Sequence, residues 1–335
     1  MKFLICGIGS IGQRHYKNLV ALGHEVAVLR SGVSTQYHQS FLEEFFKGEK
    51  EHGREVQRFF NWEEALSVFN PEAIFVTNPN SHHLSLAIPA AEARKHIFIE
   101  KPVASRLDGL SKLEELQRKN KLVVTVGYNF RFHPLLQKMK ELCEGGVIGK
   151  IIAANVEMGE NIEDWHPWED YRESYAPWKE GGGGVTLCFS HDIHYLYWFL
   201  GMPHKIQAIG GKLTSLGGDA EDVVKALLEF ENGAIASLHL DYWQRPPRRS
   251  FEILGAEGKM IWDYYSKTLT LLPHRKGAEP EIWTDPEGFD RNSMFIDEVK
   301  NFIDAIKKNQ EPAITLREGR DVLKIALEIT HQLPL

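Results

Sequence analysis

The chain has 335 residues, of which 43% are hydrophobic and 25% are charged, an ordinary composition for a globular protein with a sizeable core. A net charge of −7 argues against a nucleic-acid partner or an anionic membrane surface. No apolar run approaches the roughly 18 residues of a membrane span. The three cysteines are too few and too widely spaced for a disulfide framework. We therefore expect a cytoplasmic protein with no secretory signal and, from its length, two domains.

A glycine-rich segment, Gly7-Ile8-Gly9-Ser10-Ile11-Gly12, joins the apolar run 3–6 to a predicted helix over 13–22. A strand, a glycine turn and a helix in this order form the dinucleotide-binding fingerprint. Gly7 permits the tight turn, Gly9 allows the backbone to approach a pyrophosphate, and Gly12 allows helix and strand to pack closely. The N–H groups of the helix N-terminus then face the phosphates. The alternative is a plain strand–helix turn without a ligand.

The end of the second predicted strand, 25–29, bears on cofactor choice. NAD-specific folds place an Asp or Glu near this point to accept hydrogen bonds from the ribose 2′-OH. This chain has Arg30 and Ser31 instead, a cation and a hydroxyl that suit a 2′-phosphate. We therefore favour NADP slightly over NAD. The alternative is that Arg30 is a surface residue and that either cofactor binds.

The rest of the first half alternates between helices and strands. Strands are predicted over 56–60, 73–77, 96–99 and 122–126, and helices over 36–50, 62–69, 81–95 and 108–120, with Ser81 as an N-cap. This alternation predicts a doubly wound parallel sheet, a Rossmann domain over 1–125. Candidate ligand residues lie at the ends of two strands. The strand 73–77 ends in Thr77 and is followed by Asn78, Pro79 and His83, and the strand 96–99 is followed by Glu100 and Lys101. Ligands bind at the carboxyl ends of such strands.

Lys101 directly follows a buried strand and precedes Pro102. A lysine in apolar surroundings near a cofactor can have a lowered pKa and exchange a proton. The alternative is that Lys101 only pairs with Glu100.

The second half changes pattern to longer strands, predicted over 151–159, 205–214, 223–231, 234–242, 250–254, 259–262 and 268–272. The tight turn 231–233 joins two of them, so the sheet should be mainly antiparallel and open. Helices are predicted over 137–144, 186–200, 294–308 and 318–333. These elements predict an α+β domain over 126–335. A large open sheet favours self-association into a homodimer or homotetramer.

Two stretches of this second domain contain candidate site residues. The loop 165–175 is dense in aromatic and charged residues, including Trp165, Tyr171 and Arg172, which suit a polar ligand; an exposed ion pair is the alternative for Arg172. The helix 186–200 contains Cys188, His191 and His194. These are zinc-ligand types, but steps of three residues drift around a helix, so we expect no metal. His191 is instead a candidate general acid and base, with a structural histidine as the alternative.

Several of these motifs together resemble the Gfo/Idh/MocA (glucose–fructose oxidoreductase/inositol dehydrogenase) family. They are the glycine turn 7–12, the turn 77–83, Glu100-Lys101-Pro102, Gly127-Tyr128-Asn129 with Arg131, and the glycine run 181–184 with Ser190-His191-Asp192. The resemblance implies NAD(P)-dependent hydride transfer to or from a secondary alcohol of a sugar, sugar acid, inositol or nucleotide sugar. It implies that Lys101 and His191 handle the proton, that a cis bond precedes Pro102, and that Asn129, Arg131 and the aromatic loop shape the pocket. The implied cofactor residues are Gly7, Gly9, Ser10, Ile11, Gly12, Arg30, Asn78, Pro79, His83 and Glu100.

The chain departs from the family pattern at two positions beside the histidine. Cys188 stands where relatives usually have an aspartate, and His194 where many have a second one. Loss of a carboxylate there changes the pKa and orientation of a histidine. Asp192 is a possible substitute, although it points about 100° away from His191 on a helix. A catalytically silent nucleotide-binding regulator or scaffold is therefore the alternative function, and a metal-dependent hydrolase is a third.

Overall fold

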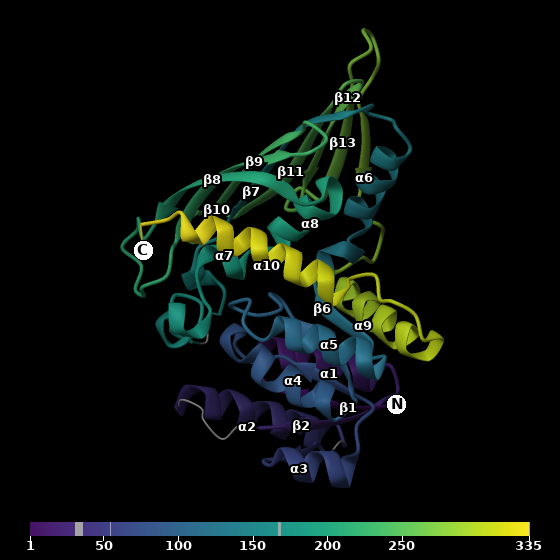
Figure 1. Cartoon of the computed structure of the whole chain (residues 1–335), viewed down its shortest axis with the longest axis vertical. Coiled ribbons are helices and arrows are strands. Elements are labelled where there is room, and N and C mark those ends of the chain that lie inside the picture. The colour runs from purple at the N-terminus through teal and green to yellow at the C-terminus, as the bar shows by residue number, and fades with distance from the viewer. Residues whose placement is uncertain (31–35, 54, 167–168, 335) are drawn as a thin grey trace. The chain divides into compact units, whose positions relative to one another are not determined.

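The computed structural model describes residues 1–30, 36–53, 55–166 and 169–334. These residues form two compact units (Figure 1). Unit 1 consists of Met1–Gly127 and Phe295–Arg320, and unit 2 consists of Tyr128–Met294 and Asp321–Leu335. Neither unit is a single continuous stretch of chain.

Unit 1 is built on a parallel sheet of six strands, in the order β3-β2-β1-β4-β5-β6. The strands are β1 (Lys2–Cys6), β2 (Glu25–Leu29), β3 (Gln57–Phe59), β4 (Ala73–Val76), β5 (His96–Glu100) and β6 (Val124–Gly127). Every residue of β4 is buried, as expected for a strand covered on both faces. The strand order reverses between β1 and β4, and ligands of open α/β sheets bind beyond the carboxyl ends of the strands at such a point. The predicted doubly wound sheet is confirmed.

The helices of unit 1 cover both faces of this sheet. They are α1 (Ser10–Ala21), α2 (Gln36–Glu51), α3 (Trp62–Glu64), which continues as a π-helical turn (Ala65–Phe69), α4 (His83–Glu92) and α5 (Leu110–Asn120). On one face, α1 and α2 pack with residues of α9 (Arg291–Lys308) in an apolar cluster that includes Phe3, Phe75, Phe98 and Phe302. The prediction of Ser81 as an N-cap was wrong. Ser81 lies inside a 3₁₀ turn (Asn80–His82), and α4 begins at His83 without a side-chain cap.

Unit 2 contains a sheet of eight strands, in the order β14-β13-β12-β11-β7-β10-β9-β8. Their bounds are β7 (Ile151–Gly159), β8 (Pro203–Gly211), β9 (Val223–Phe230), β10 (Ile235–Asp241), β11 (Arg248–Gly255), β12 (Gly258–Asp263), β13 (Thr268–Pro273) and β14 (Glu281–Thr284). Neighbouring strands are antiparallel except β7 and β10, which pair in parallel with Ile235 opposite Ala153. The predicted mainly antiparallel sheet is confirmed. We did not predict β14, a short edge strand with largely exposed residues.

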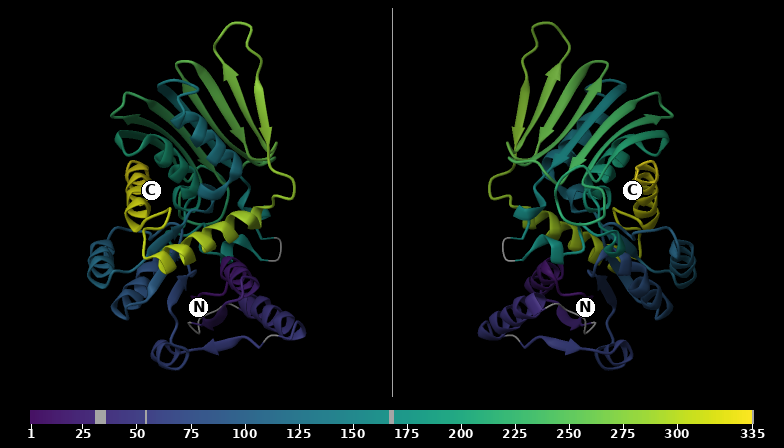
Figure 2. Two further views of the ribbon diagram at one scale, coloured as in Figure 1. Left: turned by 90° about the vertical axis from the view of Figure 1, so that its right-hand side faces the viewer. Right: turned by 90° about the vertical axis from the view of Figure 1, so that its left-hand side faces the viewer.

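The described helices of unit 2 that pack on its sheet lie on one face. These helices are α6 (Pro134–Glu144), α8 (Ser190–Leu200) and the part of α10 (Leu316–His331) that belongs to this unit. Within the described part of the chain, no helix covers the opposite face (Figure 2). On β9 the alternation is clear, because Val224, Ala226 and Leu228 are buried while Leu227 is 60% exposed.

Candidate active site

The glycine turn between β1 and α1 is packed so closely that Gly7 and Gly12 leave no room for a Cβ atom. A Cβ atom at Gly12 would lie 2.0 Å from the carbonyl oxygen of Gly7, and one at Gly7 would lie 2.7 Å from the amide nitrogen of Asn78. Gly7 also has a φ of +103°, which L-residues rarely adopt. The Oγ1 atom of Thr77 donates to the Gly7 carbonyl over 2.5 Å. The turn is therefore fixed against the end of β4.

The residues of this turn fit a dinucleotide. Gly9 is the N-cap of α1 and offers no side-chain oxygen, and the first helical turn, with Ser10 and Ile11, contains no acidic residue. The free N–H groups of the helix thus face outward without a competing negative charge. Beside them, the Oδ1 atom of Asn78 is buried and has no hydrogen-bond partner among the described residues. A ligand that brings a donor to Asn78 and phosphate oxygens to α1 would satisfy both.

Arg30 follows β2, as predicted, but its setting does not select a cofactor. Its N–H donates to the carbonyl oxygen of Phe59 over 3.0 Å. Its guanidinium lies 5.8 Å from the ring centroid of Phe60, a side chain that is 65% exposed. Ser31 lies outside the described residues.

The segment Glu100-Lys101-Pro102 is anchored on both sides. One Glu100 oxygen lies 2.6 Å from Nε2 of His15, and the other accepts the N–H of Lys101 over 3.1 Å. The Lys101–Pro102 peptide bond is cis, as the family resemblance implied. His83 is completely buried, and its ring nitrogens lie 2.8 Å from the carbonyl oxygens of Pro102 and Asn78. His83 thus ties the Asn78-Pro79 turn to the Lys101 segment, and burial lowers the pKa of its imidazole.

In unit 2, His191 lies in the first turn of α8 between two aromatic rings. Its ring centroid is 5.2 Å from that of Phe130 and 5.7 Å from that of Tyr128, both in edge-to-face geometry. His194 stacks on Tyr128 at 4.2 Å. Between the two aromatics, Asn129 is 1% exposed, and its Oδ1 atom has no hydrogen-bond partner among the described residues. This buried amide oxygen is a candidate for contact with a ligand.

Three other predicted ligand residues are engaged in the structure of unit 2 itself. The Arg131 guanidinium lies 4.2 Å from the ring centroid of Trp198. Arg172 forms a two-point ion pair with Asp170 at 2.9 and 2.6 Å and is 63% exposed, which is the alternative considered from the sequence. The Tyr171 hydroxyl accepts the N–H of Gly217 over 2.9 Å.

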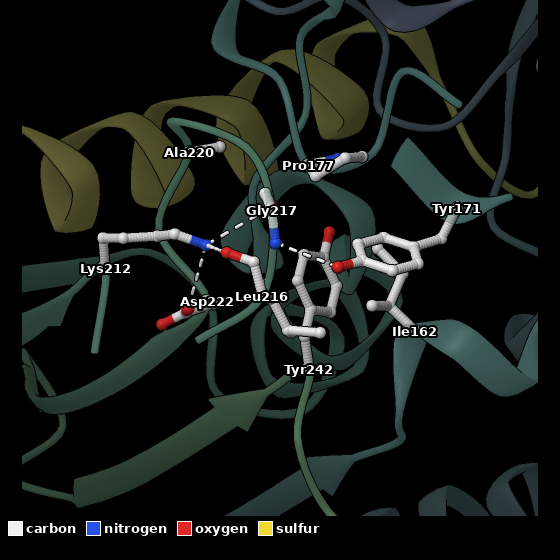
Figure 3. Close-up of a pocket in the computed structure, with 9 residues that line it drawn as sticks. All are labelled: Ile162, Tyr171, Pro177, Lys212, Leu216, Gly217, Ala220, Asp222 and Tyr242. Carbon is white, nitrogen blue, oxygen red and sulfur yellow. Dashed lines mark hydrogen bonds and ion pairs between the residues drawn. The ribbon is translucent and has the colours of Figure 1, made fainter. Parts of the chain in front are cut away.

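Tyr171 also lines a narrow hollow with Ile162 and Tyr242 (Figure 3). Lys212, on the wall of the hollow, donates hydrogen bonds to the carbonyl oxygens of Leu216 and Gly217. Its ammonium also forms an ion pair with Asp222 at 3.4 Å. These polar groups satisfy one another, so the hollow gives no independent indication of a ligand.

Trp165 packs against Phe189 and Tyr242 with centroid distances of 5.5 and 5.3 Å. Its indole Nε1 is buried, and no described residue accepts a hydrogen bond from it. Of the predicted residues in the aromatic loop, Trp165 is therefore the one with a polar atom to offer a ligand.

The predicted helix 186–200 is interrupted. It is divided into α7 (Val185–Cys188) and α8 by Phe189, whose φ and ψ are −97° and 28°. Glu221 explains why glycine precedes α7, since a Cβ atom at Gly184 would lie 2.4 Å from its carboxylate. That carboxylate accepts the N–H of Thr186 over 3.1 Å. In the described ranges, no group of three or more His, Cys, Asp or Glu side chains is placed to hold a metal ion.

Asp192, the residue after His191, is bound by two other side chains of unit 2. Its carboxylate is completely buried and is bound by Arg249 at 3.2 and 3.1 Å and by the Tyr195 hydroxyl at 2.5 Å. Burial raises the pKa of Asp192, and the Arg249 guanidinium opposes that shift. We did not single out Arg249 from the sequence. Its place on β11, two and four residues before the buried Phe251 and Ile253, was an available indication that it points inward.

Comparison with known proteins gives two family matches. The model described as "Oxidoreductase family, NAD-binding Rossmann fold" matches residues 1–128. The model described as "GFO/IDH/MocA C-terminal domain" matches residues 136–261. Among curated proteins, myo-inositol 2-dehydrogenase from Thermotoga maritima is 24% identical, and the match covers 96% of this chain and 93% of the relative's chain.

Among the described helices, none combines the length and the apolar character that a membrane-spanning helix requires.

Solved structures share the fold along almost the whole chain. Levoglucosan dehydrogenase in complex with NADH and levoglucosan superposes with a TM-score of 0.84 at 19% identity, covering 99% of this chain and 96% of its own. UDP-N-acetylglucosamine 3-dehydrogenase from Acidithiobacillus ferrooxidans has a TM-score of 0.79 at 20% identity, covering 99% of this chain and 97% of its own.

Proposed function

The chain belongs to the GFO/IDH/MocA family of NAD-dependent oxidoreductases, and on that premise we propose that it exchanges a hydride with a sugar-like secondary alcohol or its ketone. The substrate class is a sugar, sugar acid, inositol or nucleotide sugar. In this proposal the segment 1–125 binds the cofactor and 126–335 the substrate. The observation that carries it is the anchoring of Lys101, at the carboxyl end of β5, to α1 through Glu100 and His15.

The proposed cofactor residues surround the glycine turn and the ends of β2, β4 and β5. They are Gly7, Gly9, Ser10, Ile11, Gly12, Arg30, Ser31, Thr77, Asn78, Pro79, His83, Glu100 and Lys101. The unpartnered Asn78 oxygen and the open N-terminus of α1 support this assignment. The nicotinamide ring supplies or accepts the hydride when the cofactor is bound. We favour NADP over NAD because Arg30 offers a cation for a 2′-phosphate.

We assign the proton handling to Lys101 and His191. In the oxidation direction, His191 takes the proton from the substrate hydroxyl oxygen, or Lys101 does so. The Lys101 ammonium stabilises the negative charge that develops on that oxygen. The proposed substrate residues are Lys101, Asn129, Arg131, Trp165, Tyr171, Arg172 and His191. The support is strongest for Asn129 and Trp165, whose buried polar atoms lack partners among the described residues.

The first experiment is a thermal-shift screen followed by turnover. NAD+ and NADP+ are tested with myo-inositol, levoglucosan and UDP-N-acetylglucosamine, the compounds named in the matched proteins, and with related sugar acids. A bound ligand raises the melting temperature by mass action, and turnover is read as NAD(P)H absorbance.

With the best compound, Lys101→Met and His191→Asn should each lower kcat about 100-fold or more. Lys112→Met and His204→Asn are matched controls, because both side chains are exposed and pair with surface glutamates. Undiminished turnover in both site variants would refute the assignment. Cofactor binding without turnover across the whole panel would instead support the nucleotide-binding regulator or scaffold.

We also propose a cytoplasmic homodimer or homotetramer. The uncovered sheet face presents Leu227, Ile235 and Ile282, which are 60%, 56% and 63% exposed, on three different strands. Exposed apolar side chains on one face mark an association surface. Sedimentation velocity should show an oligomer that Leu227→Lys weakens and Val68→Lys, on unit 1, does not. A monomeric wild-type protein at micromolar concentration would refute this proposal.

A further inference from the structure

We propose that Arg249 is the positioning residue for His191, holding the imidazole through Asp192 on one side and Phe130 on the other. The inference rests on the proposed function, in which His191 handles the proton. It deepens that function by naming the group that takes over the positioning role at a site where Cys188 stands in place of an aspartate. All the residues concerned belong to unit 2.

The first route runs through a buried ion pair. Arg249 extends from β11 and grips Asp192 of α8 with two N–H groups, Nε at 3.2 Å and Nη2 at 3.1 Å. The Tyr195 hydroxyl, one helical turn along α8, donates to the same carboxylate over 2.5 Å. The side chains of Arg249 and Asp192 are only 8% and 0% exposed. Such a fork fixes the direction as well as the distance between its two partners.

This ion pair acts on the first turn of α8, the turn that also contains His191. Asp192 is the residue after His191, in the first turn of the helix, and the interruption at Phe189 separates that turn from α7. The backbone that carries His191 is therefore not extended from a continuous helix. The Asp192–Arg249 pair attaches this turn to β11, so that it constrains the direction in which the His191 side chain leaves the helix.

The second route runs through an aromatic ring. The Arg249 guanidinium lies 4.5 Å from the ring centroid of Phe130, within the range of a cation–π contact. The Phe130 ring in turn meets the His191 imidazole edge to face, with centroids 5.2 Å apart and planes at 63°. The same guanidinium thus anchors the residue next to His191 and supports the ring that the imidazole packs against.

Cys188, which stands where the family resemblance leads us to expect an aspartate, offers a thiol and not a carboxylate. Cys188 is buried, and its side chain hydrogen bonds with Tyr242. A thiol is a weak hydrogen-bonding group and is not an anionic partner for an imidazole. In this proposal Arg249 orients the imidazole through the backbone at Asp192 and through the Phe130 ring.

The test compares Arg249→Lys with Arg248→Lys. Lysine keeps the charge but loses the fork. Arg248 is the neighbouring residue on β11, where it is 50% exposed and pairs with Glu157 at 3.0 Å, so it is a matched control. The direct readout is the ¹³Cε1–¹Hε1 resonance of His191 in the ¹³C-histidine-labelled holoprotein. The peak is assigned by its loss in His191→Asn, and its position reports the ring current of Phe130.

We expect Arg249→Lys to shift the His191 resonance and to lower kcat about tenfold or more, while the KM for the nicotinamide cofactor stays unchanged. Arg248→Lys should change none of these. An unshifted resonance in folded Arg249→Lys, or a kcat equal to that of the wild type, would overturn the proposal. If Arg249→Lys does not fold, the paired variant Asp192→Asn/Arg249→Met removes both charges together, and wild-type kcat in that variant would also overturn it.

The proposed function can fail separately. If His191→Asn keeps full turnover, His191 is not the acid or base. The resonance shift in Arg249→Lys still decides whether Arg249 positions the imidazole.

Discussion

The Nε2 atom of His15 lies 2.6 Å from Oε1 of Glu100, across 85 residues of sequence. His15 is completely buried, with the rings of Phe75, Phe98 and Phe295 within 6.0 Å of its own. The contact joins α1, which begins at the glycine turn, to Glu100, the last residue of β5, which Lys101 directly follows. The helix that we propose to face the cofactor phosphates and the proposed catalytic lysine are therefore linked by a buried contact within unit 1.

Replacement of His15 tests this link. His15→Leu leaves a Glu100 oxygen without its partner in an apolar environment, so the free energy of unfolding should fall by about 1–3 kcal/mol. Urea denaturation measures this fall, and isothermal titration should show weaker cofactor binding. His204→Leu is the control, since His204 is exposed and pairs with Glu229 at 3.9 Å. Equal stability of the two variants would contradict a supporting role for His15.

Glu298 gives a prediction about pH. It lies on α9, 2% exposed, and neither carboxylate oxygen has a hydrogen-bond partner among the described residues. Burial, and then the charge of Glu100, hold its pKa well above the ordinary 4.5. Because the folded state binds this proton more tightly than the unfolded state, the contribution to stability is full below about pH 4.5 and is lost as pH rises toward the folded pKa.

Glu298→Gln removes that loss while keeping the shape of the protonated acid. The variant should gain stability over the wild type as pH rises from 5 to 7, by up to about 1.4 kcal/mol per pH unit. Urea denaturation at several pH values measures the gain, and Glu311→Gln, at an exposed loop position, should show none. A difference independent of pH would mean that Glu298 does not titrate with folding.

Arg30 gives a prediction about cofactor choice. If its guanidinium pairs with a 2′-phosphate, Arg30→Ala should weaken NADP+ binding about tenfold, leave NAD+ binding unchanged, and reduce the salt dependence of NADP+ binding. Isothermal titration measures both affinities. Arg58→Ala is the control, because Arg58 is an exposed residue of the adjacent strand β3. Unchanged NADP+ affinity in Arg30→Ala would remove the basis for preferring NADP.

Two glycines should respond in opposite directions to alanine. At Gly12 the new Cβ would lie 2.0 Å from the Gly7 carbonyl oxygen, so the turn must open, at a cost of about 1–3 kcal/mol and with loss of cofactor binding. Gly48 lies inside α2, and a Cβ there meets nothing within 4 Å. Gly48→Ala should therefore stabilise the fold by about 0.5–1 kcal/mol. Urea denaturation of both variants is the measurement, and a neutral Gly12→Ala would contradict the close packing of the turn.

Local pattern was sufficient for much of the fold. The bounds of β2 (Glu25–Leu29) and β7 (Ile151–Gly159) are those predicted. Strands of this kind can be recognised because an apolar run, or an alternation of apolar and polar residues, is a pattern of consecutive residues. The interruption at Phe189 was missed because no glycine or proline marks it in the sequence. The contact that holds the start of α7 is also distant in sequence, since Glu221, 35 residues away, accepts the N–H of Thr186.

The same distinction holds for the candidate site. The glycine turn and Glu100-Lys101-Pro102 are contiguous, so their motifs could be recognised. The pairs His15–Glu100 and Asp192–Arg249 span 85 and 57 residues, and no local pattern joins their members. Arg172 is a case in which both members are close in sequence, since its guanidinium pairs with Asp170, two residues earlier, and its role toward a ligand stays a prediction.

The division of the chain also has a consequence for biosynthesis. The apolar cluster of unit 1 includes Phe302 of α9. The ring centroid of Phe302 lies 5.8 Å from those of both Phe75 and Phe98. The whole of Tyr128–Met294 is made before that residue leaves the ribosome. At typical translation speeds this interval lasts about 10–30 s. During this time the apolar side chains that α9 covers in the folded unit 1 lack that cover. The nascent first half is thus exposed to aggregation, and chaperones that shield apolar surface should bind it until α9 is synthesised.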